Sequence, residues 1–206
     1  MRKALEVGGI LAAIVLIAFG IGAIVTGIDG KNTVSDNLKL EQIVGTPDMT
    51  PAEIKKTAAA AKLPSSIDLP TCTVADQTVD NGERARCFAS YMRIHALEAT
   101  GGKAYAELPR FATADGAGTN DEAAALKKNG QAVDNPIRNV WINETALSTA
   151  LNTAYMAERI SVFGIVTGIA MLLTGIGLGL LSLAVFGAMR GPKRRDEESQ
   201  PSAATT

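Results

Sequence analysis

Two long runs of uncharged, mostly apolar residues dominate the pattern of the chain. Residues 7–28 and 160–189 contain no formal charge. As helices that rise about 1.5 Å per residue they would be about 33 Å and about 45 Å long, and the hydrocarbon core of a bilayer requires only ~30 Å. The pattern therefore predicts two transmembrane helices with one polar segment, residues 29–159, between them.

The polar segment shows helical signals next to both spans. Asp29-Gly-Lys-Asn predicts a break at the membrane interface, after which residues 33–44 continue at helical spacing as a first stalk. At the other end, a polar-faced helix with its N-terminus near Asn143 runs without proline into the second span. We therefore expect two stalks that lead away from the membrane.

Further helix signals lie between the stalks. Thr50, Pro51 and Glu53 predict a capping box that opens a helix over residues 51–62. Apolar spacing predicts a second helix over residues 82–100, which Gly101-Gly102 would end. Thr119 and Glu122 form another capping-box pattern, which predicts a helix over residues 121–128.

The expected fold class is all-α. Two transmembrane helices would extend outward as a helical hairpin stalk, joined by a small disulfide-bonded helical cap. Residues 64–81 carry turn signals and little periodicity, so we expect an irregular loop there.

The basic residues near the ends of the spans predict the orientation in the membrane. Arg2, Lys3, Arg190, Lys193, Arg194 and Arg195 flank the two spans. By the positive-inside rule, residues 1–6 and the basic, then disordered tail 190–206 should be cytoplasmic, and residues 29–159 extracytoplasmic. The predicted location is the cell membrane, with two passes.

A cleaved signal peptide is the alternative interpretation of the N-terminus. Met1-Arg-Lys is a suitable charged beginning, but the apolar run is longer than the usual signal-peptide core. Residues 23–29 also offer no clear cleavage site. We therefore favour an uncleaved anchor.

The chain has two cysteines, Cys72 and Cys87, and both lie in the segment expected outside the cytoplasm. An even pair in an oxidising compartment predicts a structural disulfide bond. A redox-active pair would normally be spaced Cys-x-x-Cys, and this pair is not.

Small residues recur four apart in both spans, which permits close helix packing in lipid. They are predicted to form a packing or partner face and are Ala18, Gly22, Ala23, Gly27, Gly164, Gly168, Gly175 and Gly179. Two interpretations remain open: the spans pack on each other, or this face binds another membrane protein or a second copy of the chain. Neither span has an ionisable residue in its interior, which disfavours ion transport.

Reactive side chains are few. His95 is the one histidine, so a zinc or iron site with several imidazoles is excluded. A site of His95 with carboxylates such as Glu98 stays open, and an ordinary helix-face histidine is the simpler interpretation. No Gly-x-Ser-x-Gly elbow accompanies a serine, which disfavours a hydrolase. A candidate ligand pocket would comprise Tyr91, His95, Phe111 and Trp141.

Three weaker motifs have simpler explanations. Asp115, Asn120, Asp121 and Glu122 have calcium-type oxygen ligands, but their spacing does not fit an EF-hand and suits a turn. The Lys193-Arg-Arg cluster could contact anionic lipid, yet it also serves as the topology signal. Asn143-Glu-Thr matches a glycosylation sequon. We predict no metal, no cofactor and no nucleic-acid partner.

Several segments resemble a group of uncharacterised two-span membrane proteins from actinobacteria, over nearly the whole chain. The resemblance rests on residues 2–10, 91–102, 112–116, 118–121 and 139–158. Some members of the group carry an automatic label as aromatic-ring-opening dioxygenases. Non-heme iron usually requires two histidines and a carboxylate, so the single His95 argues against that activity here.

The resulting hypothesis is a non-enzymatic membrane protein, an accessory or scaffold subunit of a membrane or cell-envelope complex. Its expected partners are membrane lipid and another membrane protein or a second copy. The alternative is an extracytoplasmic sensor or ligand-binding module that signals through a partner, and an exported enzyme is the weakest of the three.

Overall fold

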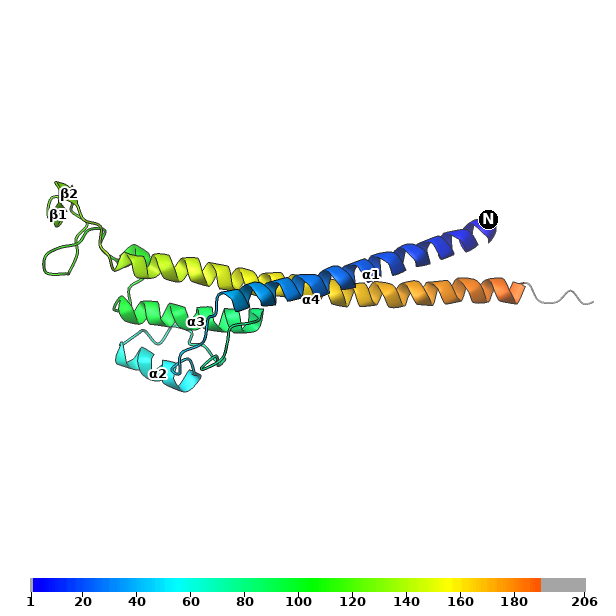
Figure 1. Ribbon diagram of the computed structural model, residues 1–206, viewed down its shortest axis with the longest axis horizontal. Helices are drawn as coiled ribbons and strands as arrows, with labels where there is room; N and C mark the ends of the chain where they lie inside the picture. Colours follow the sequence, from blue (N-terminus) through cyan, green and yellow to red (C-terminus); the bar gives the residue numbers. More distant parts are fainter. Residues whose placement is uncertain (1, 190–206) are drawn as a thin grey trace, which may run out of the picture. The chain divides into compact units, whose positions relative to one another are not determined.

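The structure, a computed structural model, describes the backbone of residues 2–189 and the side chains of residues 7–185. The described residues form a largely helical fold (Figure 1). Its elements are α1 (Arg2–Leu40), α2 (Pro51–Ala60), α3 (Gly82–Ala99), the 3-10 turn η1 (Tyr105–Glu107), β1 (Lys127–Lys128), β2 (Gln131–Ala132) and α4 (Arg138–Met189). The chain divides into two compact units. The first has described residues 2–25 and 166–189, and the second is Thr26–Ile165.

The two long apolar helices predicted from the sequence are confirmed as α1 and α4. The predicted break at Asp29–Asn32 is wrong, because α1 continues without interruption to Leu40. Gly30 lies against α4, where an added Cβ would meet the hydroxyl of Ser161 at 2.6 Å. Packing of this kind outweighs the low helix propensity of glycine.

Helix α4 is likewise continuous, and it begins at Arg138 rather than near Asn143 as predicted. Asn135 and Pro136 precede it as a turn, since Arg138 N donates to the carbonyl of Asn135 and Asn139 N to that of Pro136. Trp141 therefore lies within the first turns of the helix.

Helix α3 begins and ends as the sequence predicts. The side chain of Asn81 caps it by accepting a hydrogen bond of 3.0 Å from Arg84 N. Gly101 and Gly102 follow with φ of 64° and 78°, the left-handed conformation that glycine adopts readily. Gly102 N donates to Leu97 O at 2.7 Å, which satisfies one of the last carbonyls of the helix.

Helix α2 confirms half of its predicted capping box. Thr50 Oγ1 accepts a hydrogen bond from Glu53 N at 3.2 Å. The carboxylate of Glu53 does not return to the backbone of Thr50 but contacts Lys56 at 2.7 Å. The helix ends at Ala60, two residues before the predicted Lys62, which has a φ of 53°.

The hydrophobic core of the second unit lies around α3. The largest fully buried side chains are those of Tyr91, Ile54, Ile94, Val74 and Val79. Residues from α1, α2 and α4, including Leu38 and Leu151, complete the same cluster. In Figure 1, α3 runs beside the N-terminal part of α4, with α2 on its other side. The core therefore fixes α3 against α4.

The loop before α3 is held by a disulfide bond between Cys72 and Cys87, which confirms the predicted pairing. Isolated β-bridges from Val44 to Thr78 and from Gly45 to Ala75 join the same loop to the segment that follows α1. The irregular loop predicted for residues 64–81 is thus ordered by covalent and backbone contacts.

The helix predicted over residues 121–128 is wrong. Thr119 Oγ1 accepts from Asp121 N, and Asp121 Oδ1 accepts from Ala123 N, so the side chains form local turns that compete with a helix. Lys127–Lys128 instead pairs with Gln131–Ala132 in an antiparallel hairpin. Its turn residues Asn129 and Gly130 have φ of 53° and 79°, as a two-residue hairpin turn requires. The fold is therefore not purely helical.

Within the first unit, α1 packs closely against α4 through glycines. A Cβ added to Gly20 would meet Gly168 O at 2.8 Å, and one added to Gly168 would meet Gly20 O at 2.7 Å. A Cβ on Gly175 would meet Ala13 O at 3.0 Å. The two backbones approach here to a distance that only glycine permits.

Candidate functional site

The four residues of the predicted ligand pocket have different surroundings. Tyr91 is fully buried and donates a hydrogen bond of 2.6 Å from its hydroxyl to Cys72 O. Trp141 is also buried, and its Nε1 donates to Lys103 O at 2.9 Å. Phe111 is buried outside their core cluster, in β-bridges with Thr119 and Asp134. Three of the four side chains therefore serve packing.

His95 lies between two carboxylates on the partly exposed face of α3. Its Nε2 is 3.2 Å from Asp48 Oδ2, and its Nδ1 is 3.4 Å from Glu98 Oε2. The carboxylates approach opposite nitrogens of the ring, so the three groups do not surround one point. Among the described side chains, no three His, Cys, Asp or Glu residues converge as metal ligands.

The electrostatic surroundings of Asp48 shift two groups. A hydrogen bond from the side chain of Thr46 lowers the pKa of the Asp48 carboxyl, and the nearby His95 acts in the same direction. Burial raises the pKa of the Tyr91 hydroxyl, and the charge of Asp48 adds to that effect. The contact between Asp48 and His95 thus joins the turn before α2 to α3.

The turn residues that the sequence offers as calcium ligands instead form hydrogen bonds within their own loop. Asp115 accepts from Thr113 Oγ1 at 2.5 Å and from Ala117 N at 3.2 Å, and these hydrogen bonds lower its pKa. Asn120 accepts from Arg110 N at 2.9 Å. These oxygens therefore shape the loop.

The predicted small-residue face is used unevenly within the chain. Gly168 and Gly175 face α1 in the first unit. A Cβ added to Gly179 would lie 3.6 Å from the Cβ of Ala13. In the second unit, a Cβ on Gly27 would meet Ser161 O at 2.6 Å. Four predicted residues lie wholly or partly on the surface: Ala18 and Gly22 are exposed, and Ala23 and Gly164 are half-buried. The close contact also uses Ala13 and Gly20, which were not predicted.

The residues predicted to set topology and contact lipid lie outside the described side chains. They are Arg2, Lys3, Arg190, Lys193, Arg194 and Arg195. The first two belong by their backbone to α1.

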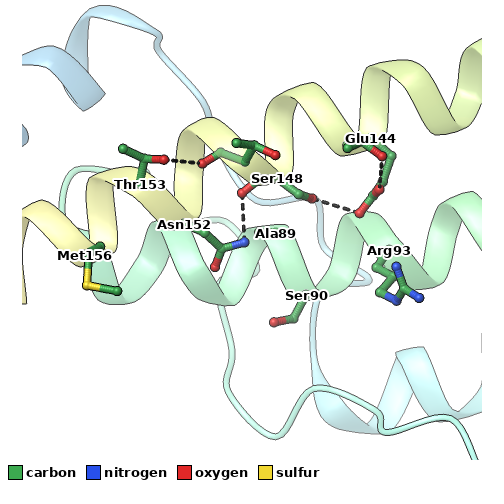
Figure 2. Close-up of a pocket in the computed structure, with 10 residues that line it drawn as sticks. Ala89, Ser90, Arg93, Glu144, Ser148, Asn152, Thr153 and Met156 are labelled. Carbon is green, nitrogen blue, oxygen red and sulfur yellow. Dashed lines mark hydrogen bonds between the residues drawn. The ribbon is translucent and has the colours of Figure 1, made fainter.

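A groove between α3 and α4 is the clearest candidate site of the second unit (Figure 2). It is open to solvent and has a volume of about 650 Å³. Helix α3 supplies Ala89, Ser90 and Arg93, and α4 supplies Glu144, Thr145, Ser148, Thr149, Asn152, Thr153 and Met156. Six of the ten lining residues carry a hydroxyl or an amide group, one is an acid and one a base, and the carbon atoms of their side chains also face the groove.

Glu144 is the buried charged group of this groove, with a relative exposure of 5%. Its Oε1 accepts a hydrogen bond of 2.9 Å from Ser148 Oγ, and its Oε2 lies 3.4 Å from Thr145 Oγ1. Both hydroxyls come from the same helix, within about one turn. No described basic side chain forms an ion pair with this carboxylate.

Arg93 lies on the α3 side of the groove. Its guanidinium stands over the ring of Trp141, 5.4 Å from the ring centre. Because Trp141 is buried and hydrogen-bonded to Lys103 O, its ring is a rigid support for the guanidinium. Arg93 thus contacts the ring of Trp141, and the hydroxyls of Ser148 and Thr145 contact the carboxylate of Glu144.

Sequence reasoning missed this groove. The signal was the repeat of Thr145, Ser148, Thr149, Asn152 and Thr153, which lie on one face of a helix at spacings of three and four. That stripe alone is also typical of a solvated helix surface. Only the pairing with α3 makes it one wall of a groove.

The described fold defines a helical, disulfide-bonded protein with two helices long and apolar enough to cross a membrane. No protein family model, curated protein or solved structure matches the chain. Its function therefore has to be inferred from the geometry itself.

Proposed function

We propose that the chain is an integral membrane protein that crosses the bilayer twice, through residues 7–28 of α1 and residues 160–189 of α4. The observation that carries this proposal is the exposure of large apolar side chains on both helices. Phe19, Phe163 and Leu181 are 66%, 71% and 68% exposed. A long core helix of a soluble protein would bury such side chains, whereas lipid would cover them.

In the proposed topology both termini are cytoplasmic and residues 29–159 are extracytoplasmic, with α1 and α4 prolonged as a hairpin stalk beneath a helical cap. The basic residues beside the spans support this orientation. The disulfide bond between Cys72 and Cys87 supports an oxidising location for the cap. The cell membrane is then the compartment.

Labelling with a membrane-impermeant maleimide tests this topology, because the native cysteines are joined and do not react. Glu122→Cys in the central segment should react in intact cells. Ser202→Cys in the C-terminal tail should react only after permeabilisation. Reaction of the tail cysteine in intact cells, or protection of Cys at position 122, would contradict the orientation, and the unsubstituted chain controls for background.

We further propose a non-enzymatic role as an accessory or scaffold subunit of a membrane or cell-envelope complex. Gly168 and Gly175 already pack against α1 of the same chain. Ala18, in contrast, is exposed on α1 and available to a helix of another protein. A partner helix or a second copy would pack on that side.

Crosslinking in native membranes, followed by purification through a C-terminal tag and mass spectrometry, tests the role. A stoichiometric membrane partner or a defined homo-oligomer supports it. Ala18→Leu should reduce recovery of that partner, while Ala12→Leu, also at an exposed position, should not. Recovery of a monomer alone would contradict the role of subunit.

The second candidate function is an extracytoplasmic sensor or ligand-binding module. The groove between α3 and α4 favours it, because a pocket of about 650 Å³ falls in the range of small-molecule sites. The same α4 that lines the groove continues into the proposed second span. This candidate predicts that ligand binding changes the association of the protein with its partner.

A further inference from the structure

We propose that the groove between α3 and α4 binds a small hydroxylated primary amine, whose ammonium group is received by Glu144. This inference rests on the second candidate function, the ligand-binding module, and names the ligand class. It is independent of the orientation in the membrane, because every lining residue belongs to the unit Thr26–Ile165.

The carboxylate of Glu144 is the first argument. A buried carboxylate is costly unless a charged partner or hydrogen-bond donors compensate it. Ser148 and Thr145 supply neutral hydroxyls, and no described cation pairs with Glu144. An ammonium ion in the groove would supply the missing positive charge and form charge-assisted hydrogen bonds.

Three further polar side chains of the lining present acceptors. Ser90 Oγ donates its hydrogen to Arg86 O at 3.0 Å, and Thr153 Oγ1 donates to Thr149 O at 2.8 Å. The amide nitrogen of Asn152 donates to Ser148 O at 2.8 Å. Each side chain thus donates a hydrogen bond to a carbonyl oxygen of its own helix, and its own oxygen keeps lone pairs that can accept from a ligand in the groove.

An acceptor-rich groove selects a ligand that is rich in donors. An ammonium group offers three N–H donors, and each hydroxyl of the ligand offers one more. Figure 2 shows Asn152 and Thr153 along α4 from Ser148 and Glu144, so acceptors extend beyond the carboxylate. Phosphates and carboxylates offer only acceptors, and Arg93 is the single basic group of the lining that could meet them.

A third apolar helix fits this groove less well. Helix-in-groove binding depends on large apolar side chains that enter apolar pockets. Met156 is the one long apolar side chain of the lining, and it lies at one end of the groove (Figure 2). The chemistry of the walls therefore favours a hydrophilic small molecule.

Fluorescence of Trp141 provides a direct test with the full chain in detergent micelles, where both faces are accessible. Trp141 is the one tryptophan of the sequence, and its ring contacts Arg93 at the groove. The probe is glucosamine at slightly acidic pH, and N-acetylglucosamine is the matched compound without an ammonium group. We expect a saturable change with glucosamine, half-complete at about 1 mM or below, and none with N-acetylglucosamine.

Three substitutions decide the role of the carboxylate. Glu144→Gln keeps an acceptor for Ser148 but removes the charge, and should weaken glucosamine binding about tenfold or more. Thr149→Lys, at an exposed position of the lining, should weaken it similarly by placing a like charge in the groove. Glu122→Gln removes one negative charge outside the groove and should leave binding unchanged.

Melting temperatures of all variants show whether each remains folded, and Thr149→Lys carries the test if Glu144→Gln does not fold. Equal binding of the two sugars, no saturation with glucosamine, or equal loss in Glu122→Gln and Glu144→Gln would overturn the proposal. None of these results depends on the maleimide labelling, so failure of the topology and failure of the site are distinguishable.

Discussion

The backbone N–H of Gly82, the first residue of α3, donates a hydrogen bond to the carboxylate of Glu158 in α4. A side chain at position 82 has no room, because an added Cβ would meet Tyr155 Cα at 2.8 Å. The carboxylate also lies at the positive end of the α3 dipole, where negative charge is favourable. This contact fixes the end of α3 on α4, and it thereby holds one wall of the groove against the other.

Glu158→Ala should therefore destabilise the second unit. The substitution removes a helix-capping hydrogen bond and a favourable charge at a half-buried position, and we expect a loss of about 1 kcal/mol in the free energy of unfolding. Denaturant unfolding followed by Trp141 fluorescence measures the loss. Glu122→Ala, which removes an exposed carboxylate, should change little, and equal effects of the two substitutions would count against the contact.

The glycine contacts between α1 and α4 predict a second effect, within the first unit. Gly168→Ala would place its Cβ 2.7 Å from Gly20 O and 2.9 Å from Ile24 N, so the helices must move apart. Overpacking of this kind costs about 1–3 kcal/mol. Thermal unfolding in a mild detergent should reveal a lower midpoint.

Gly177→Ala is the matched control for that substitution. It lies on the same helix, and its added Cβ meets nothing within 4 Å. Alanine has the higher helix propensity, so this variant should be neutral or slightly stabilised. A common loss in both variants would mean that helix contact in this unit does not depend on Gly168.

Local signals predicted much of the helical structure. Thr50 caps α2 through its side-chain oxygen, Gly101-Gly102 follows α3, and the long uncharged runs form α1 and α4. These features depend on residues close in sequence, which is why pattern reasoning found them. Asn129-Gly130 is an equally local signal, and it forms the hairpin turn where the capping-box pattern of Thr119 and Glu122 predicts a helix.

Features that depend on contacts distant in sequence were not predictable. The break expected at Gly30 does not occur, because Ser161 lies against that glycine. The groove requires Arg93 and Glu144 from helices about fifty residues apart to line one space. A sequence shows the polarity of each helix face, but the choice of facing residues depends on the packing of the whole unit.

The disulfide bond predicts a third measurable effect. Cys72 and Cys87 close a loop of 15 residues, which in the chain-entropy model stabilises the fold by about 3 kcal/mol. Reduction, or replacement of both cysteines by serine, should lower the unfolding midpoint accordingly. The reductant should have no effect on the doubly substituted chain, and a shift in that chain would show that it acts elsewhere.

Asp48 predicts an acid-sensitive contribution to stability. The hydrogen bond from Thr46 and the nearby His95 lower the pKa of this carboxyl in the folded state below its ordinary value of 3.8. The unfolded chain therefore takes up the proton more readily, and the contribution is present above the ordinary pKa and lost as pH falls through the folded one. The stability of the unit should decline correspondingly between about pH 5 and strongly acidic solution.

Asp48→Asn isolates this contribution. The variant should be less stable than the unsubstituted chain at neutral pH and should approach it as the solution becomes strongly acidic, because the charge of Asp48 is then lost in both. Denaturant unfolding at a series of pH values measures the difference. The pKa of Asp115 is lowered in the same direction by the Thr113 hydroxyl, so Asp115→Asn should act likewise and additively from its separate loop. A stability curve for Asp48→Asn that runs parallel to that of the unsubstituted chain at every pH would show that Asp48 does not titrate differently in the fold.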